Sequence, residues 1–184
     1  LDSASRLRSE TKLGHGPVVV CEDASGSMDG AKQQWAKALV LALAHYAKLL
    51  RRSFGWVLFD TYPRIVRTYP QGVLSAKALL EIAESRAGGG TDFESPLREA
   101  VRMIREEGLK KADILLVTDG MCAVSDKFLK ELLAVKRALE MNIFTVLVNV
   151  GETADATIRE FSDKIVPISA LTADEAENKI FRHL

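Results

Sequence analysis

Three short segments of the chain combine aspartate, serine or threonine with glycine. Asp23 to Ser27 follows an apolar run, Gly88 to Asp92 begins with three glycines, and Thr118 to Gly120 ends a second apolar run. Carboxylate and hydroxyl oxygens are hard ligands, which suit Mg²⁺, Mn²⁺ or Ca²⁺ better than Zn²⁺. Glycine allows the backbone to approach a ligand closely. These residue types predict a divalent-metal site wherever the fold brings the three segments together.

The spacing within and between the segments supports the same chemistry. Asp23, Ser25 and Ser27 occupy every second position, so an extended segment can point all three side chains to one side. We expect Asp119 to approach from a neighbouring strand and Thr91 from a third loop. Mg²⁺ prefers octahedral geometry and keeps several waters, so a site with few charged ligands leaves the ion electrophilic, with one position open.

Each segment also has an ordinary structural interpretation. Asp23, Ser25 and Ser27 could form a polar turn that caps the following helix. The dipeptide that starts at Asp119 could be a simple turn, and the run of three glycines could be a flexible hinge. The metal hypothesis rests on all three segments meeting at one edge of the predicted sheet.

Short apolar runs alternate with long amphipathic ones, which is typical of βαβ units. Strands are expected over residues 17–22, 55–60, 65–69, 112–118, 142–150 and 164–168. Helices are expected over residues 31–52, 75–86, 93 or 95 to 107, 126–140, 153–161 and 172–183. The link between the second and third strands is too short for a crossover helix, so that pair should be antiparallel.

This pattern predicts an α/β fold with a doubly wound, Rossmann-like sheet of six strands. The sheet should be parallel except for one antiparallel edge strand, with helices on both faces. In such a sheet, ligands bind beyond the carboxyl ends of the strands, where the strand order reverses. The three polar segments are expected at that edge.

Several neighbouring polar residues are expected to have structural roles. We predict that Asp29 caps the helix starting at residue 31, and that Asp60 caps the turn between the antiparallel strands. Asp92 is expected to cap the next helix or support the site from behind. Glu22 should point to the opposite face from Asp23 and be structural.

The apolar residues predict which faces are buried. Trp35 and Trp56 are expected in the core, and Cys21 is expected to be a buried thiol, whereas Cys122 should lie near the rim of the site. His15, His45 and His183 do not cluster, so no metal role is expected for them. The helix faces expected to contact the core are Trp35, Leu39, Ala42, Leu43, Tyr46 and Leu50 in one helix and Leu79, Leu80, Ile82 and Ala83 in the next.

Composition limits the possible partners. The 184 residues include 25 Lys and Arg and 25 Asp and Glu, so the formal net charge is zero. A nucleic-acid partner is not expected, because binding to phosphates needs a positive surplus. No membrane span is expected, because the longest purely apolar run has seven residues, from Ala38 to Ala44, against about 20 for a spanning helix. With only two cysteines, a reducing compartment and a cytoplasmic location are expected.

The motif Asp23-x-Ser25-x-Ser27, with Thr91 after a glycine run and Asp119 before Gly120, resembles a von Willebrand factor A (VWA) domain with an intact metal-ion-dependent adhesion site. The resemblance implies that Ser25, Ser27 and Thr91 contact the metal directly and that Asp23 and Asp119 often act through water. It also implies that a carboxylate of a protein partner fills the open position. Residues 17–184 would be the VWA domain.

The segment GPVVVCEDASGSMDG is most similar to intracellular prokaryotic VWA proteins of the ViaA and CoxE type. Those proteins work with MoxR-class AAA+ ATPases, so the resemblance implies such a partner. The chain does not begin with Met, and we expect residues 1–16 to be a linker or the tail of an upstream region.

Two functions of other classes are alternatives to an interaction module. A phosphoryl-transfer enzyme of the haloacid dehalogenase type also has an Asp after its first strand, but needs a second carboxylate two residues later, where this chain has Ser25. A phosphoacceptor receiver domain could use Glu22, Asp23 and Asp60, yet the strand ending near residue 150 leads to Gly151 and Glu152 and not to a lysine. We therefore expect a metal-dependent binding module without catalysis.

Overall fold

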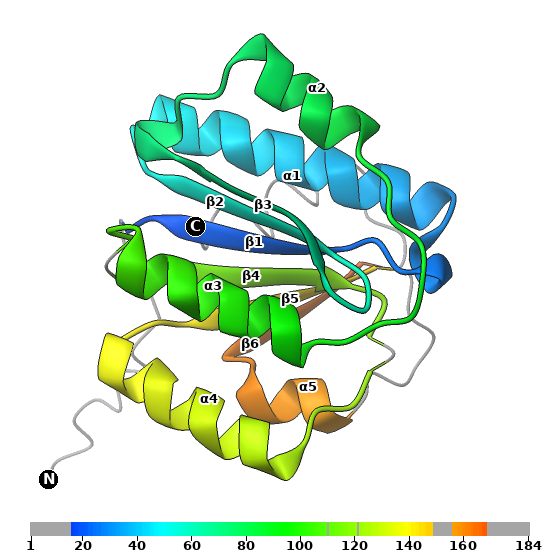
Figure 1. The fold of residues 1–184 in the computed structure, drawn as a ribbon, viewed down its shortest axis with the longest axis vertical. Coiled ribbons are helices and arrows are strands. Elements are labelled where there is room, and N and C mark those ends of the chain that lie inside the picture. Colours follow the sequence, from blue (N-terminus) through cyan, green and yellow to red (C-terminus); the bar gives the residue numbers. More distant parts are fainter. Residues whose placement is uncertain (1–15, 110, 121, 149–155, 169–184) are drawn as a thin grey trace, which may run out of the picture.

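The computed structural model describes residues 16–109, 111–120, 122–148 and 156–168. Their strands form one sheet of six strands in the order β3-β2-β1-β4-β5-β6 (Figure 1). The strands are β1 (Val18–Asp23), β2 (Phe54–Phe59), β3 (Pro63–Tyr69), β4 (Asp113–Thr118), β5 (Ile143–Val148) and β6 (Lys164–Ile168). All neighbours are parallel except β2 and β3. The predicted fold class and the antiparallel edge pair are confirmed.

Burial along the strands explains this arrangement. The four inner strands, β1, β2, β4 and β5, are buried at every position. Such continuous apolar strands are typical of a parallel sheet covered by helices on both faces. The edge strands β3 and β6 are only partly buried. Strand β3 runs antiparallel to β2 because the three residues between them are too few for a crossover connection.

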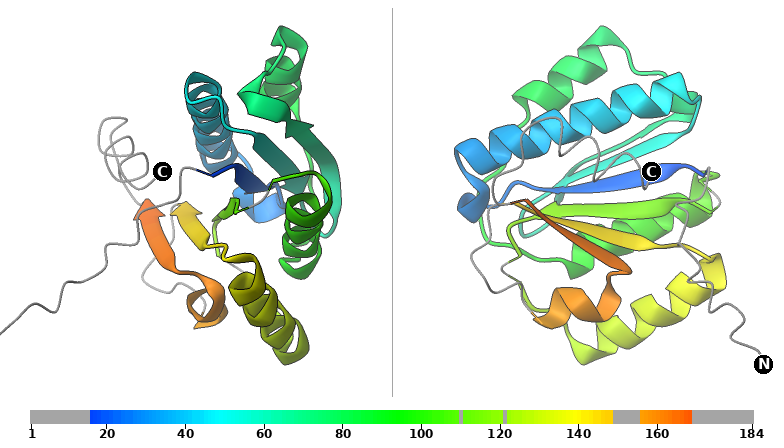
Figure 2. Two further views of the ribbon diagram at one scale, coloured as in Figure 1. Left: turned by 90° about the vertical axis from the view of Figure 1, so that its left-hand side faces the viewer. Right: turned by 180° about the vertical axis from the view of Figure 1, so that it is seen from behind.

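Helices cover both faces of the sheet (Figure 2). The helices are α1 (Ala31–Leu49), α2 (Ala76–Glu84), α3 (Glu94–Glu106), α4 (Asp126–Leu139) and α5 (Ala156–Phe161), with short 3-10 turns η1 (Gly26–Met28) and η2 (Pro70–Gly72). Helices α1 and α2 lie on one face, and α3, α4 and α5 lie on the other. The expected helix over 172–183, the end of the expected strand over 142–150 and the start of the expected helix over 153–161 fall outside the described residues.

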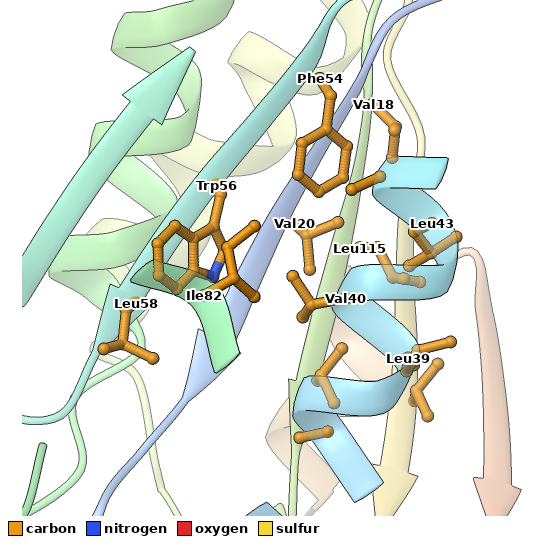
Figure 3. Packing of buried hydrophobic residues seen from close by; sticks show 14 of the residues in the cluster. Val18, Val20, Leu39, Val40, Leu43, Phe54, Trp56, Leu58, Ile82 and Leu115 are labelled. Carbon is orange, nitrogen blue, oxygen red and sulfur yellow. The ribbon is translucent and has the colours of Figure 1, made fainter. Parts of the chain in front are cut away.

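The two faces of the sheet belong to two separate apolar clusters. One cluster joins the sheet to α1 and α2 and includes Trp56, Val20 and Val40. Figure 3 shows these three side chains with their neighbours from β2, β4 and α1. The other cluster joins the sheet to α3, α4 and α5 and includes the predicted buried thiol of Cys21. Alternate residues of one strand therefore pack into different clusters.

The predicted buried faces of α1 and α2 are partly wrong. In α1 the buried stripe is Ala36, Leu39, Val40, Leu43, Ala44 and Ala47, whereas Trp35 is half-buried. Leu50, expected in the core, is 43% exposed at the end of this helix. Half of the buried residues of α1 are alanines, which a hydropathy pattern led by large residues does not identify.

In α2 the error has a different cause. Only Ala78 and Ile82 are buried, while Leu79 is 40% exposed, Leu80 is 57% exposed and Ala83 is also exposed. This helix lies over α1 near the sheet edge, so one narrow row of residues four positions apart makes the contact.

No described helix is long and apolar enough to span a membrane.

Candidate functional site

The site begins where β1 and β4 end side by side. These strands pair in parallel, with Glu22 opposite Val117, so their next residues enter adjacent loops. The Thr118 hydroxyl donates a hydrogen bond to Asp23 Oδ2 at 2.6 Å, and the Gly120 amide donates to Thr118 Oγ1 at 3.0 Å. Gly120 has φ +87°, which an L side chain rarely adopts. The loop that carries Asp119 is therefore tied to the end of β1.

The first polar segment folds back on its own aspartate. Asp23 Oδ1 accepts the Ser25 amide at 2.9 Å, and the Ser25 and Ser27 hydroxyl oxygens lie 3.1 Å apart. Asp23 and Ser25 are buried, whereas Ser27 is exposed. The two hydroxyl groups lie together because the 3-10 turn η1 begins between them.

The glycine loop reaches the same place. The Gly26 amide donates to the Gly89 carbonyl at 3.0 Å, which joins the first and second polar segments. Thr91 follows two residues later and is half-buried. The Cys122 thiol donates to the Thr91 carbonyl at 3.4 Å, which joins the second segment to the chain two residues beyond the third. The first segment therefore contacts both of the others at the carboxyl edge of the sheet, and Cys122 lies beside Thr91, as predicted for the rim.

Two of the aspartates expected to cap turns or helices do so. Asp60 is buried and accepts hydrogen bonds from the Tyr62 amide at 3.2 Å and Arg64 Nε at 2.8 Å. Burial raises the pKa of Asp60, but these hydrogen bonds outweigh it and hold the pKa below its usual range. Asp92 accepts the Glu94 and Ser95 amides, both at 3.1 Å, at the start of α3. Both capping predictions are confirmed.

The prediction that Asp29 caps α1 is wrong. The N-cap is Gly30, with φ +81°, and its position has no side-chain cap from the described residues. The Asp29 carboxylate instead accepts the Gly30 amide at 2.9 Å. The helix starts at Ala31 as predicted, but Asp29 ends the 3-10 turn η1 and Gly30 takes the cap position, where the positive φ favours glycine.

Asp119 provides the clearest indication that a cation belongs here. Its side chain is only 3% exposed, and its Oδ1 is buried with no hydrogen-bond partner among the described residues. Its Oδ2 pairs with Lys32 Nζ at 3.0 Å. A buried carboxylate oxygen without a partner is costly, so a metal ion or a metal-bound water would satisfy it.

The donor set fits a hard divalent cation. Among the described residues, no group of three or more His, Cys, Asp or Glu could hold a metal. The available donors are instead two carboxylates, Asp23 and Asp119, with the hydroxyls of Ser25 and Ser27 beside Asp23 and Thr91 in the glycine loop that contacts Gly26. Burial raises the pKa of Asp23, and the charge of Asp119 raises it further. A dication would offset this repulsion, and hydroxyl donors suit Mg²⁺, Mn²⁺ or Ca²⁺.

A family model for VWA domain containing CoxE-like proteins matches residues 3–151. The chain is a member of this VWA family. It is 35% identical to the uncharacterized protein MJ0811 of Methanocaldococcus jannaschii over 97% of the chain, and 38% identical to MJ0077 of the same organism over 90%. The chain spans about two fifths of the length of these two relatives, at 40% and 41%.

Solved structures share the fold of this VWA domain at low sequence identity. The VWA domain of the pilus tip protein Mfa5 from Porphyromonas gingivalis has a TM-score of 0.70 and 11% identity, with 91% of this chain and 96% of that chain covered. BatB from Bacteroides thetaiotaomicron has a TM-score of 0.68 and 16% identity, with the same coverage. A von Willebrand factor type A protein from Catenulispora acidiphila has a TM-score of 0.67 and 18% identity, with 91% and 41% covered.

The hydrogen-bond partners of Lys32 and Glu22 in this VWA domain were not predicted from the sequence. Lys32 lies on the first turn of α1, nine positions after Asp23, a spacing that could have drawn attention to it. Glu22 points away from Asp23 into the α1 face, as predicted, where it accepts hydrogen bonds from Trp56 Nε1 and Gln33 Nε2, both at 2.9 Å. It is fully buried. Burial raises the pKa of Glu22 to about 7, although Trp56, Lys37 and Gln33 act in the opposite direction.

Glu22 should make the metal-free VWA domain less stable as the pH rises. Its pKa of about 7 lies above the ordinary value of 4.5, so between these pH values the folded state binds more protons than the unfolded state. The free energy of unfolding then falls as the pH increases through this window. Glu22→Gln is expected to remove this fall, with a relative gain of up to about 3 kcal/mol at pH 8 compared with pH 4.5.

Urea unfolding of both proteins in EDTA, from pH 4.5 to pH 8, measures this difference. The exposed Glu84 of α2 provides the control, because Glu84→Gln makes the same change in charge at the surface. Equal pH dependence of wild type and Glu22→Gln would contradict the expectation.

Proposed function

We propose that this VWA domain is a divalent-metal-dependent protein-interaction module that binds a carboxylate of its partner through the metal. The observation that carries the proposal is the buried Oδ1 of Asp119, which no described residue pairs with, beside Asp23 and the paired hydroxyls of Ser25 and Ser27. VWA domains are in general protein-interaction modules, which supports the same class of function.

The VWA family pattern implies how the residues of such a site divide the contacts with the ion. Ser25, Ser27 and Thr91 would hold Mg²⁺, or Mn²⁺ or Ca²⁺, by direct contact, and Asp23 and Asp119 would hold its waters. The bound ion would supply an electrophilic position for an incoming carboxylate, a strong charge-assisted contact. Thr118 keeps Asp23 oriented through the 2.6 Å hydrogen bond, and the exposed Ser27 side of the loop leaves room for a partner.

The chain's own groups favour binding over phosphoryl transfer. The position two residues after Asp23 holds Ser25, which cannot act as a general acid or base near neutral pH. Its hydroxyl is instead paired with Ser27. The match to CoxE-like VWA proteins favours the same class of function, and the module is proposed to have no catalysis of its own.

The partner is proposed to be a MoxR-class AAA+ ATPase in the cytoplasm. Support comes from the match to CoxE-like VWA proteins and from the acidic chemistry that a metal-bearing face would select. Since the chain spans about two fifths of its curated relatives, other parts of such a protein could also contact the partner.

Capture of a purified MoxR-class ATPase by the immobilised domain tests the proposal. Capture is expected in Mg²⁺ and is expected to be lost in EDTA and in Thr91→Ala. The control is Thr68→Ala, because Thr68 lies on β3 at the end of the sheet opposite the site. Capture that persists in EDTA and in Thr91→Ala would overturn the metal bridge. Metal-dependent phosphatase activity that disappears in Asp23→Ala would favour the enzymatic alternative.

A further inference from the structure

Lys32 places a positive charge directly on the site. Its Nζ donates to Asp119 Oδ2 and to the Ser27 carbonyl, both at 3.0 Å. It therefore joins the third polar segment to the first, although Lys32 and Asp119 are 87 positions apart in the sequence. The side chain is 27% exposed, whereas Asp119 is 3% exposed, so the ammonium enters from the solvent side.

The ammonium performs part of what a metal would do at this place. It neutralises a buried carboxylate and holds the two loops together through one cation. Because the cation belongs to the chain, its effect does not depend on the metal concentration. The same charge also repels a dication bound to the neighbouring oxygen of Asp119, since two cations on one carboxylate are a few ångströms apart.

We propose that Lys32 is an internal counter-cation that holds the site together without metal and opposes metal binding, and so sets its metal affinity. This inference rests on the metal site of the proposed function. When a dication binds, the Lys32 ammonium either shares Asp119 with it or moves into solvent, and both outcomes cost part of the binding free energy. Removal of the charge should therefore strengthen metal binding.

Lys32→Met tests this role, because methionine keeps a straight, helix-compatible side chain and removes the charge. The protein is titrated with Mn²⁺ alone, and electron paramagnetic resonance measures the unbound ion. The affinity of Lys32→Met for Mn²⁺ is expected to be at least about 10-fold higher than that of wild type. Lys32→Arg keeps the charge and is expected to remain near wild type. Lys48→Met makes the same change about 24 Å away along α1 and should leave the affinity unchanged.

Thermal unfolding provides a second readout that a merely structural lysine would not reproduce. Without metal, Lys32→Met leaves Asp119 unpaired, so its Tm should lie several degrees below that of wild type. At saturating Mn²⁺ this difference should close, because the metal replaces the lost cation.

An affinity equal to or weaker than wild type in Lys32→Met, or a Tm deficit that saturating Mn²⁺ does not reduce, would overturn the role of Lys32 alone. Absence of Mn²⁺ binding by the wild-type protein would overturn the proposed function as well.

Discussion

Replacement of Asp23 by asparagine is expected to lower the affinity for Mg²⁺ or Mn²⁺ by about 100-fold or more, since losing one carboxylate charge near a dication costs several kcal/mol even at an effective dielectric constant of 20. The fold should survive. Asp23 is held by two donors, the Ser25 amide and the Thr118 hydroxyl. An asparagine oxygen can accept from Ser25 while its amide donates to Thr118, whose hydroxyl can reorient.

Isothermal titration with Mn²⁺ measures this loss, and circular dichroism verifies the fold. The matched control is Asp29→Asn, six residues later, where an exposed carboxylate accepts the neighbouring Gly30 amide at 2.9 Å. The same unit of charge is lost, but no buried carboxylate is removed. Unchanged Mn²⁺ affinity in Asp23→Asn, or an equal loss in both variants, would contradict a site centred on Asp23.

Trp56→Ala should destabilise the domain by about 3–5 kcal/mol, the usual range for removing a large buried aromatic side chain. Trp56 is fully buried between the sheet and the helices α1 and α2 (Figure 3). Its Nε1 also donates to Glu22 at 2.9 Å. The substitution would therefore leave a cavity and remove one of the donors to a buried carboxyl group.

Trp35→Ala is the control, because the same change is made at a residue that is only half-buried against the same cluster. Its cost is expected to be well below that of Trp56→Ala. Urea unfolding at pH 7 in EDTA, monitored by far-ultraviolet circular dichroism, compares the two free energies of unfolding. Equal losses from the two substitutions would show that burial on this face does not determine their contributions.

The alternation of apolar and amphipathic runs predicted all six strands and the five helices within the described residues, mostly to within a few positions. This succeeds because inner parallel strands are apolar throughout, whereas helices have one apolar face. The antiparallel direction of β3 followed from chain length alone, since the link after Asp60 is too short for a crossover. The division into residues 1–16 and 17–184 stays a prediction.

The faces of the helices were harder to predict. Leu79 and Leu80 are as apolar as Ile82, yet only Ile82 is buried. Periodicity identifies a helix that packs against something, but the width of the buried strip depends on what lies opposite. Over α1 that strip is one row wide, so two leucines remain at the surface.

Local patterns in the sequence predicted the order of the elements and placed two of the three polar segments directly after strands, because periodicity and turn residues act over short stretches of chain. What meets across long separations was set by the tertiary structure. It buried Asp119 Oδ1 away from any partner in the described part of the chain, placed Lys32 on the other oxygen of that carboxylate and enclosed Glu22 beside Trp56. Burial and charge pairing depend on which loops and helices become neighbours, and no local pattern encodes that.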